Sequence, residues 1–563
     1  MGIRELLRRW FTGSRKGRDG PPSCPAAAAS SVPEADRWCL EGAQHLESGR
    51  LAEAEHAIKR ALDIRHDHVE ALVIQSAIFA KRDRLEEATD SLVLATHFRP
   101  DFAEAHYQLG AIAARQGRTD ASEMLFRRAI LKDPSHAKAY NFLGTLLADR
   151  GAVDEAVDCF RQCVAIRPDF APAHSNLGSL LITKLDRFEE GATSIETAFR
   201  LAPDSPDVQC NWAMLLQYRG QLQEALAWWT DLINAGALAN DASARLDRAM
   251  ILLLLEDFET GWDEYEARFA ADRRTERNFG LKPWNGEPLE GKSLLIYAEQ
   301  GVGDEIMFAS CVPDLLSIAG RVVIECSGRL QDLFRRSFPG AAVVGRRSGD
   351  SGEWLSDFAP IDYQIPIGSL PRRFRRRRET FDRQHSYLKG DAGRVAHWRG
   401  RLEELGPGPA IGISWRGGNP TTRGTIRSLP PELLREQLRA DVTWVNLQHG
   451  ADALDPALGG LHRFSEVTQN LDELAALMGA LDLIISVDNT NVHLAGALGR
   501  PVWVLLASKP EWRYGVSGES MRWYASSRLY RRAYDEDWGP VLERLMCDLD
   551  RFIEESRTRS TPS

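Results

Sequence analysis

The sequence predicts an α-solenoid of paired helices followed by two parallel α/β sheets. Three observations carry this prediction. Turn residues recur about every 34 positions in the first 235 residues, strands alternate with helices in two later sets, and polar or glycine residues follow strands in both sets. A helix pair of constant length repeats in a solenoid, whereas alternating strands and helices form parallel sheets.

Residues 1–33 are expected to be a separate, disordered basic tail. Ile3–Phe11 is a short basic amphipathic stretch, and residues 13–31 are rich in Gly, Pro, Ala and Ser. Such a composition cannot bury enough apolar surface to fold. A frayed tail without function is one interpretation, and weak contact with an anionic membrane surface is the other.

Composition excludes several classes of protein. The 563 residues carry a net charge of −10, which argues against general nucleic-acid binding, and no apolar run approaches the ~20 residues of a transmembrane segment. No secretory signal is visible. The eight cysteines form no Cys-x-x-Cys pair, so neither zinc nor a disulfide framework is indicated. We therefore expect a cytoplasmic protein of three or four domains.

Residues 34–270 are expected to form the solenoid. Small residues recur five positions after each turn, prolines end four of the second helices, and Leu246–Phe269 is expected to be a last, irregular pair. Helix pairs need small residues where their backbones cross. The turn residues are Gly49, Asp83, Gly117, Gly151, Asp186 and Gly220.

Two sets of alternating strands and helices follow, over residues 271–390 and 391–553, with a tail at 554–563. Between the sets, residues 371–378 hold six arginines, which are expected to form a solvated linker; contact with an anionic substrate is the alternative.

A strand of the first set, Leu294–Ala298, is followed by Gly301, Gly303 and Asp304, where a helix is expected to begin. The glycines allow close backbone approach, but the pattern is not a dinucleotide fingerprint because residue 306 is Ile. Asp304 could be a catalytic carboxylate or could only complement the helix dipole.

The strand Leu483–Val487 is followed by Asp488, Asn489 and Thr490, and then by a helix that carries His493. Asn and Thr cap helices, and a capped helix N-terminus at the carboxyl end of a parallel strand is a natural phosphate site. An ordinary, well-capped βαβ corner is the alternative.

The repeats resemble the tetratricopeptide repeat in period and in the placement of small, aromatic and proline residues. Residues 290–550 resemble a GT-B glycosyltransferase close to the heptosyltransferases, and the whole arrangement more distantly resembles the protein O-GlcNAc transferases. The second resemblance depends on Ala298–Glu305 and on Asp488–Pro501. It implies two Rossmann-like halves that face a cleft, with the acceptor on residues 271–390 and a nucleotide-sugar donor on residues 391–553.

The resemblance also implies roles for residues. Asp304 would be the base that takes the acceptor proton, with Glu299 and Glu305 as rivals, and His493 would donate to the leaving phosphate. Further donor contacts are expected from residues of both halves: Gly301, Gly303, Arg416, Asn419, Arg427, Gln448, Asp488, Asn489 and Thr490.

Heptosyltransferases commonly use a lysine near residues 416–427, whereas this chain has only arginines there. No metal is expected, because the acidic pairs at residues 535–537 and 548–550 lie far from both glycine turns in the sequence. Three functions stay open: sugar transfer to a protein or peptide held by the repeats, transfer to a lipid-linked or polysaccharide acceptor, and a scaffold without catalysis.

Overall fold

The computed structural model describes residues 28–236, 238–271, 277–346, 352–381, 386–417, 427–449, 456–467, 470–508, 511–533 and 536–560. The chain divides into two compact units, Met1–Asn211 and Trp212–Ser563, and each is described by itself. The first unit is helical, and the second contains both sheets.

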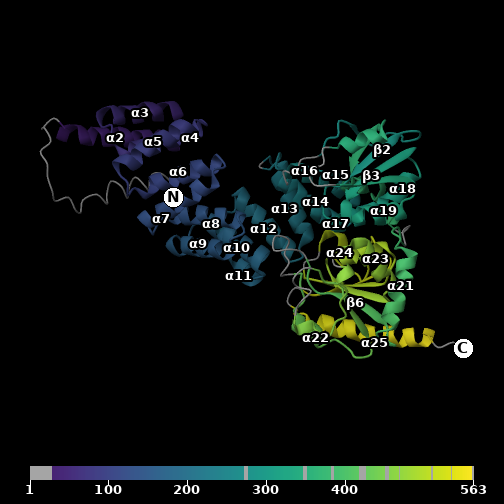
Figure 1. The fold of residues 1–563 in the computed structure, drawn as a ribbon. Helices are drawn as coiled ribbons and strands as arrows, with labels where there is room; N and C mark the ends of the chain where they lie inside the picture. Colours follow the sequence, from purple (N-terminus) through teal and green to yellow (C-terminus); the bar gives the residue numbers. More distant parts are fainter. Residues whose placement is uncertain are drawn as a thin grey trace. The chain divides into compact units, whose positions relative to one another are not determined.

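The helices of the first unit pack as consecutive antiparallel pairs (Figure 1). Their turn residues take the left-handed backbone conformation that the sequence predicts, with φ between 56° and 80°. Glycine and aspartate tolerate this conformation better than most residues do. The helices are α2 (Ala28–Glu47), α3 (Leu51–Ile64), α4 (Val69–Lys81), α5 (Leu85–Phe98), α6 (Ala103–Arg115), α7 (Thr119–Lys132), α8 (Ala137–Asp149), α9 (Val153–Ile166), α10 (Ala171–Leu185) and α11 (Phe188–Leu201).

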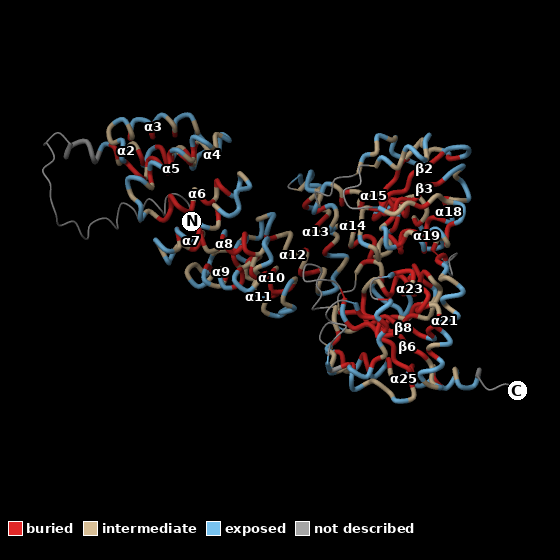
Figure 2. The backbone as a smooth tube through the Cα atoms, in the orientation of Figure 1, coloured by how far each residue is buried: buried red, intermediate tan, exposed pale blue. Residues whose placement is uncertain are grey.

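Small residues let the two helices of a pair approach closely. A Cβ atom on Gly110 would lie 2.7 Å from the ring of Phe126, and one on Gly144 would lie 2.9 Å from Phe160. The buried residues accordingly lie where the helices face each other (Figure 2). The repeat prediction is therefore confirmed in period, turn geometry and packing.

Helix α12 (Pro206–Tyr218) contains the boundary between the units, and helices continue into the second unit. The next helices are α13 (Leu222–Asn234), α14 (Ala242–Leu254), α15 (Phe258–Tyr265) and α16 (Arg268–Ala271). The expected last pair is present as α14 and α15, which pack against each other.

The expectation of a solvated arginine linker is wrong. Arg372 and Arg376 pair with Asp263 of α15, and Arg375 is buried, where it donates to Asp314 at 2.7 Å. The run joins helix α15 to the first sheet because acidic side chains surround it.

The first sheet is parallel and has the order β1-β5-β2-β3-β4. Its helices include α17, which directly follows β2. The strands are β1 (Lys282–Pro283), β2 (Ser293–Tyr297), β3 (Arg321–Ser327), β4 (Ala341–Arg346) and β5 (Tyr363–Pro366). The helices are α17 (Val302–Phe308), α18 (Val312–Leu316), α19 (Gln331–Ser337) and α20 (Pro371–Phe374).

The second sheet is also parallel and has the order β10-β9-β8-β6-β7. Its strands are β6 (Ala410–Ser414), β7 (Thr443–Asn446), β8 (Leu483–Val487), β9 (Val502–Leu506) and β10 (Ser527–Arg531). Its helices are α21 (Ala392–Glu403), α22 (Pro431–Arg435), α23 (Leu471–Ala480), α24 (Thr490–Ala497) and α25 (Gly539–Ser560).

Side chains that alternate along the central strands fill two cores. Leu483 and Ile485 of β8 pack with α25 on one face, whereas Ile484 packs with the helices of the other face. Both faces of the strand are buried, as its mostly apolar, β-branched sequence predicts. The predicted fold, a helical solenoid followed by two parallel α/β sheets, is confirmed, and it is consistent with GT-B. In the described ranges, no helix is both long and apolar enough to cross a bilayer.

Candidate functional site

Helix α24 begins at a cap that also ties two strands together. The Asn489 side chain accepts a hydrogen bond from the Asn491 N–H at 2.9 Å, which confirms the predicted cap. Its Nδ2 group donates to Ser414 Oγ at 2.8 Å and to the Arg416 carbonyl at 3.2 Å. The start of α24 is thus held against the end of strand β6.

Asp488 fixes an arginine beside this helix start. Its buried carboxylate accepts from Tyr514 Oη at 2.6 Å and lies 3.1 Å from Arg427 Nη1. Burial raises the pKa of Asp488, and the charge of Arg427 opposes that rise. Because a carboxylate repels a diphosphate, Asp488 can serve an anion site only by positioning Arg427.

Gly303 lies where the two halves touch. A Cβ atom on Gly303 would lie 3.2 Å from His493 Cδ2 and 3.4 Å from Thr490 Oγ1. Helix α17 of the first half therefore packs against α24 of the second, and the two are neighbours in Figure 1. Gly301 is the N-cap residue of α17. A Cβ atom on Gly301 would lie 3.6 Å from Asp304 Oδ2.

Arg513 joins the two expected catalytic residues. Its Nη2 atom lies 3.1 Å from Asp304 Oδ1, and its Nη1 atom lies 3.3 Å from His493 Nε2. Its Nε atom is buried and has no hydrogen-bond partner among the residues that the structure describes. The sequence prediction missed this residue, although Arg513 follows the strand β9 and the rule for strand ends applies there too.

The surroundings of His493 determine its protonation state and which ring nitrogen carries the proton. Burial, together with the charges of Arg513 and Arg427, lowers the pKa of His493, so the imidazole is neutral. An arginine only donates, so Nε2 accepts from Arg513 and the proton lies on Nδ1, which donates to Tyr524 Oη at 3.1 Å. In this arrangement Arg513, rather than His493, offers donors to an anion.

A chain of hydroxyl groups supports that tautomer. Tyr524 Oη lies 3.5 Å from Tyr387 Oη, and Tyr387 donates to the Ile306 carbonyl at 2.8 Å. Ile306 belongs to α17, so the chain runs from the second half back to the first.

The two rivals of Asp304 have other partners. Glu299 is paired with Arg268 at 3.0 Å, and burial raises its pKa. Glu305 is buried and accepts from the Ser327 N–H at 2.7 Å, and burial raises the pKa of Glu305 to about 7. Of the three carboxylates, Asp304 is the one that contacts Arg513.

Gln448 braces the turn after strand β6. Its Oε1 atom accepts from Ser414 Oγ and from the N–H groups of Trp415 and Arg416. It also lines a cavity of about 60 Å³ between the halves, together with Val302, Arg329, His449, Thr490 and Asn491. Asn419 lies outside the described residues.

The acidic pairs near the C-terminus have partners of their own. Asp548 accepts from Tyr530 Oη at 2.9 Å and pairs with Arg528 at 2.7 Å, and Asp550 pairs with Arg439. Asp535 is not among the described residues. Within the described ranges, no cluster of three or more His, Cys, Asp or Glu side chains has the geometry of a metal site.

Comparison with known proteins supports the repeats and finds a relative whose similarity covers more of the chain than the repeat family does. A family model described as tetratricopeptide repeat matches residues 107–169. Protein FlbA of Caulobacter vibrioides is 31% identical over 379 residues, which cover 63% of each chain. The present chain thus spans less than two thirds of that relative.

Solved structures match about a third of the chain. They include MamA, with 23% identity over 29% of this chain and 94% of that one, and a TM-score of 0.26. Pseudomonas aeruginosa pilF has 13% identity, coverages of 37% and 93%, and a TM-score of 0.34. Scores this low carry no argument about the sheets or their chemistry.

Proposed function

We propose that this protein is a glycosyltransferase that moves a sugar from a nucleotide-sugar donor to a hydroxyl group of a protein or peptide. The observation that carries the proposal is the contact of Arg513 with both Asp304 and His493. Arg513 thus joins a carboxylate of the first half to the cationic region around the N-terminus of α24 in the second half. Such a pairing suits a reaction in which a proton leaves an acceptor while negative charge develops on a leaving group.

The donor diphosphate would bind on the second half. The N-terminus of α24 carries positive partial charge, Arg427 lies beside it, and Arg416 follows the neighbouring strand β6. Arginine forms paired hydrogen bonds with phosphate oxygens, so these groups supply the field that a metal would otherwise provide. Thr490, which lines the neighbouring cavity, would supply a further donor contact from the second half.

The reaction would be a single displacement. The acceptor oxygen attacks the anomeric carbon, Asp304 takes the hydroxyl proton, and the bond from that carbon to the phosphate oxygen breaks. The electron pair of that bond leaves with the nucleoside diphosphate, whose charge Arg427 and Arg513 stabilise. His493 would act as a positioning residue, because its Nε2 atom holds Arg513.

A protein or peptide acceptor is favoured by the helix pairs of the first unit. Stacked repeats form an extended surface of the kind that binds polypeptides. A lipid-linked or polysaccharide acceptor needs no such surface. A scaffold without catalysis is the third candidate, and the Arg513 contacts are not expected of a degenerate site.

A donor screen tests the proposal. The full chain is heated with a panel of nucleotide sugars in the presence of a chelator, and saturation at ~100 times the dissociation constant should stabilise it by about 2.7 kcal/mol. Donor binding that disappears with chelator and returns with magnesium would contradict the metal-independent mode. Absence of stabilisation by every donor would favour the scaffold.

A further inference from the structure

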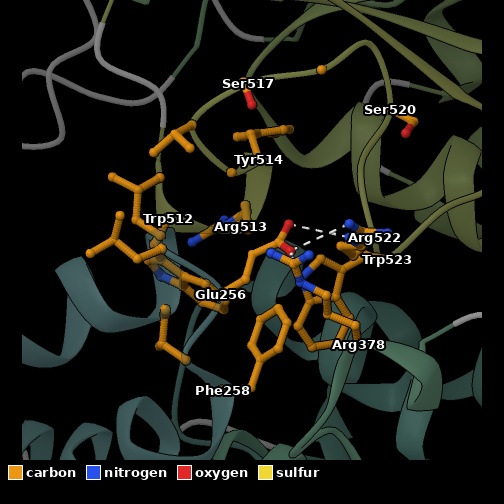
Figure 3. Close-up of a pocket in the computed structure, with 16 residues that line it drawn as sticks. Glu256, Phe258, Arg378, Trp512, Arg513, Tyr514, Ser517, Ser520, Arg522 and Trp523 are labelled. Atoms are coloured by element: carbon orange, nitrogen blue, oxygen red, sulfur yellow. Dashed lines mark hydrogen bonds and ion pairs between the residues drawn. The ribbon is translucent and has the colours of Figure 1, made fainter. Parts of the chain in front are cut away.

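A pocket of about 320 Å³ opens beside the candidate site within the second unit (Figure 3). The turn between α14 and α15 forms one wall, and the segment 512–523 that leads into β10 forms another. Its volume falls within the ~300–1,000 Å³ of typical ligand pockets. The side chains that matter to its chemistry are Glu256, Arg378, Trp512, Arg513, Ser517 and Arg522.

Glu256 occupies the turn position of a seventh helix pair. In the six preceding turns this position is Gly or Asp, whereas Glu256 adopts the same left-handed conformation with φ 63°. That conformation costs a residue with a long side chain on the order of 1 kcal/mol, and such strain persists where the surroundings enforce it.

Two arginines from other elements hold the Glu256 side chain in place. The Glu256 carboxylate pairs with Arg378, of the 3₁₀ turn η5 (Arg378–Thr380), and with Arg522 Nε at 3.2 Å; Figure 3 shows both arginines converging on it. Arg378 and Arg522 keep 58% and 43% of their side chains exposed, so a ligand can reach them. One carboxylate shared by two accessible guanidinium groups leaves an excess of positive charge at the rim.

Arg513 connects this pocket to the reacting groups. It lines the pocket and contacts Asp304 at 3.1 Å, so one side chain belongs to both. Two extended residues of a polypeptide span about 7 Å, roughly the length of that side chain. A segment held in the pocket can therefore bring a neighbouring hydroxyl group to Asp304.

We propose that the pocket binds the acceptor polypeptide by an acidic side chain located one or two residues from the hydroxyl that receives the sugar. The inference rests on the proposed function. Arg378 and Arg522 supply the charge, and the buried rings of Trp512 and Trp523 form apolar walls. The segment 516–520 offers an exposed, glycine- and serine-containing edge to a peptide backbone.

The test uses two fluorescent dodecapeptides of Gly, Ala and one Thr, which differ only in carrying Asp or Asn on both sides of the Thr. Anisotropy gives their affinities for the full chain without donor. We expect the Asp peptide to bind at least tenfold more tightly than the Asn peptide. The double variant Arg378→Gln, Arg522→Gln should lose this preference, whereas Arg335→Gln, which changes an exposed arginine of α19, should keep it.

Ser517→Trp should fill the pocket and weaken both peptides at least tenfold. If that variant melts at a lower temperature, a benzophenone amino acid at position 516 replaces it, because Val516 lines the pocket and is exposed. Cross-linking of the Asp peptide to that residue is then the expected result. Unchanged affinities in Ser517→Trp, no cross-link, or no peptide binding by the natural chain would overturn the proposal.

Donor binding is measured on the same preparations by thermal shift. If the chain binds a donor but neither peptide, the proposed transferase function stands and the proposed acceptor site in this pocket is wrong. If it binds the Asp peptide in the pocket but no donor, the peptide site stands and the proposed transferase function is wrong. The two failures are therefore distinguishable.

Discussion

Glu305→Gln is expected to stabilise the protein at alkaline pH and to leave turnover nearly unchanged. Glu305 is buried, and burial raises its pKa from the ordinary 4.5 to about 7. The folded state therefore holds its proton over a pH range in which the unfolded chain has released it. Stability should fall as the pH rises from about 4.5 to about 7, because the folded carboxyl ionises at a free-energy cost.

The full difference of about 2.5 pKa units corresponds to roughly 3 kcal/mol, and about 2–3 kcal/mol of it falls between pH 5 and pH 8.5. Glutamine keeps an oxygen that can accept the 2.7 Å hydrogen bond from the Ser327 N–H but cannot ionise. The variant should thus gain about 2–3 kcal/mol relative to the natural chain over that range.

Urea denaturation at pH 5 and pH 8.5, followed by tryptophan fluorescence, measures the gain. Glu403→Gln, at an exposed position of α21, is the matched control and should show no such dependence. An equal stability difference at both pH values would refute the reasoning about burial. A fall in turnover of two orders or more would mean that Glu305, rather than Asp304, is the base.

Three further outcomes are expected. Asp304→Asn should lower turnover by about two orders or more with little change in donor affinity, measured by steady-state kinetics and thermal shift; transfer at the natural rate would place the base elsewhere. Arg513→Lys keeps the charge but not the paired geometry, so the loss of a charge-assisted hydrogen bond, about 1.5–3 kcal/mol, should reduce kcat/KM roughly 10- to 100-fold. Burial alone would raise the pKa of Glu70, but hydrogen bonds with His68 and Arg99 outweigh it and lower the pKa to about 2. The ionised Glu70 therefore stabilises the folded state above about pH 4.5, and this stabilisation is lost as the pH falls towards 2. Glu70→Gln should lower the free energy of unfolding by about 1–2 kcal/mol at pH 7, a value reduced because Arg99 is partly exposed, and by almost nothing near pH 2. Urea denaturation at the two pH values measures the difference.

The sequence was sufficient for the fold because its signals are periodic. Each turn position between residues 49 and 220 needs a left-handed backbone, and each pair of crossing helices needs a small residue. Likewise, the short, mostly apolar and β-branched run Leu483–Val487 favours a strand buried on both faces.

Tertiary partners were harder to predict. A run of six arginines has the composition of a solvated linker, yet Asp263 and Asp314, distant in sequence, form ion pairs with three of them. Arg513 was missed for a related reason. It lies in a short 3₁₀ turn without periodicity, and its importance arises only from its contacts with Asp304 and His493.

The same contacts hold the halves together and form the candidate site, so stability and chemistry have to be separated by experiment. Asp304 and Gly303 come from the first half, whereas Arg513 and His493 come from the second. A change in the angle between the halves would alter these distances together. Removing the charge of Asp304 weakens an ion pair between the halves as well as removing a base. For this reason donor affinity is the decisive companion measurement: a base acts on turnover alone, whereas a loosened contact between the halves also weakens the donor.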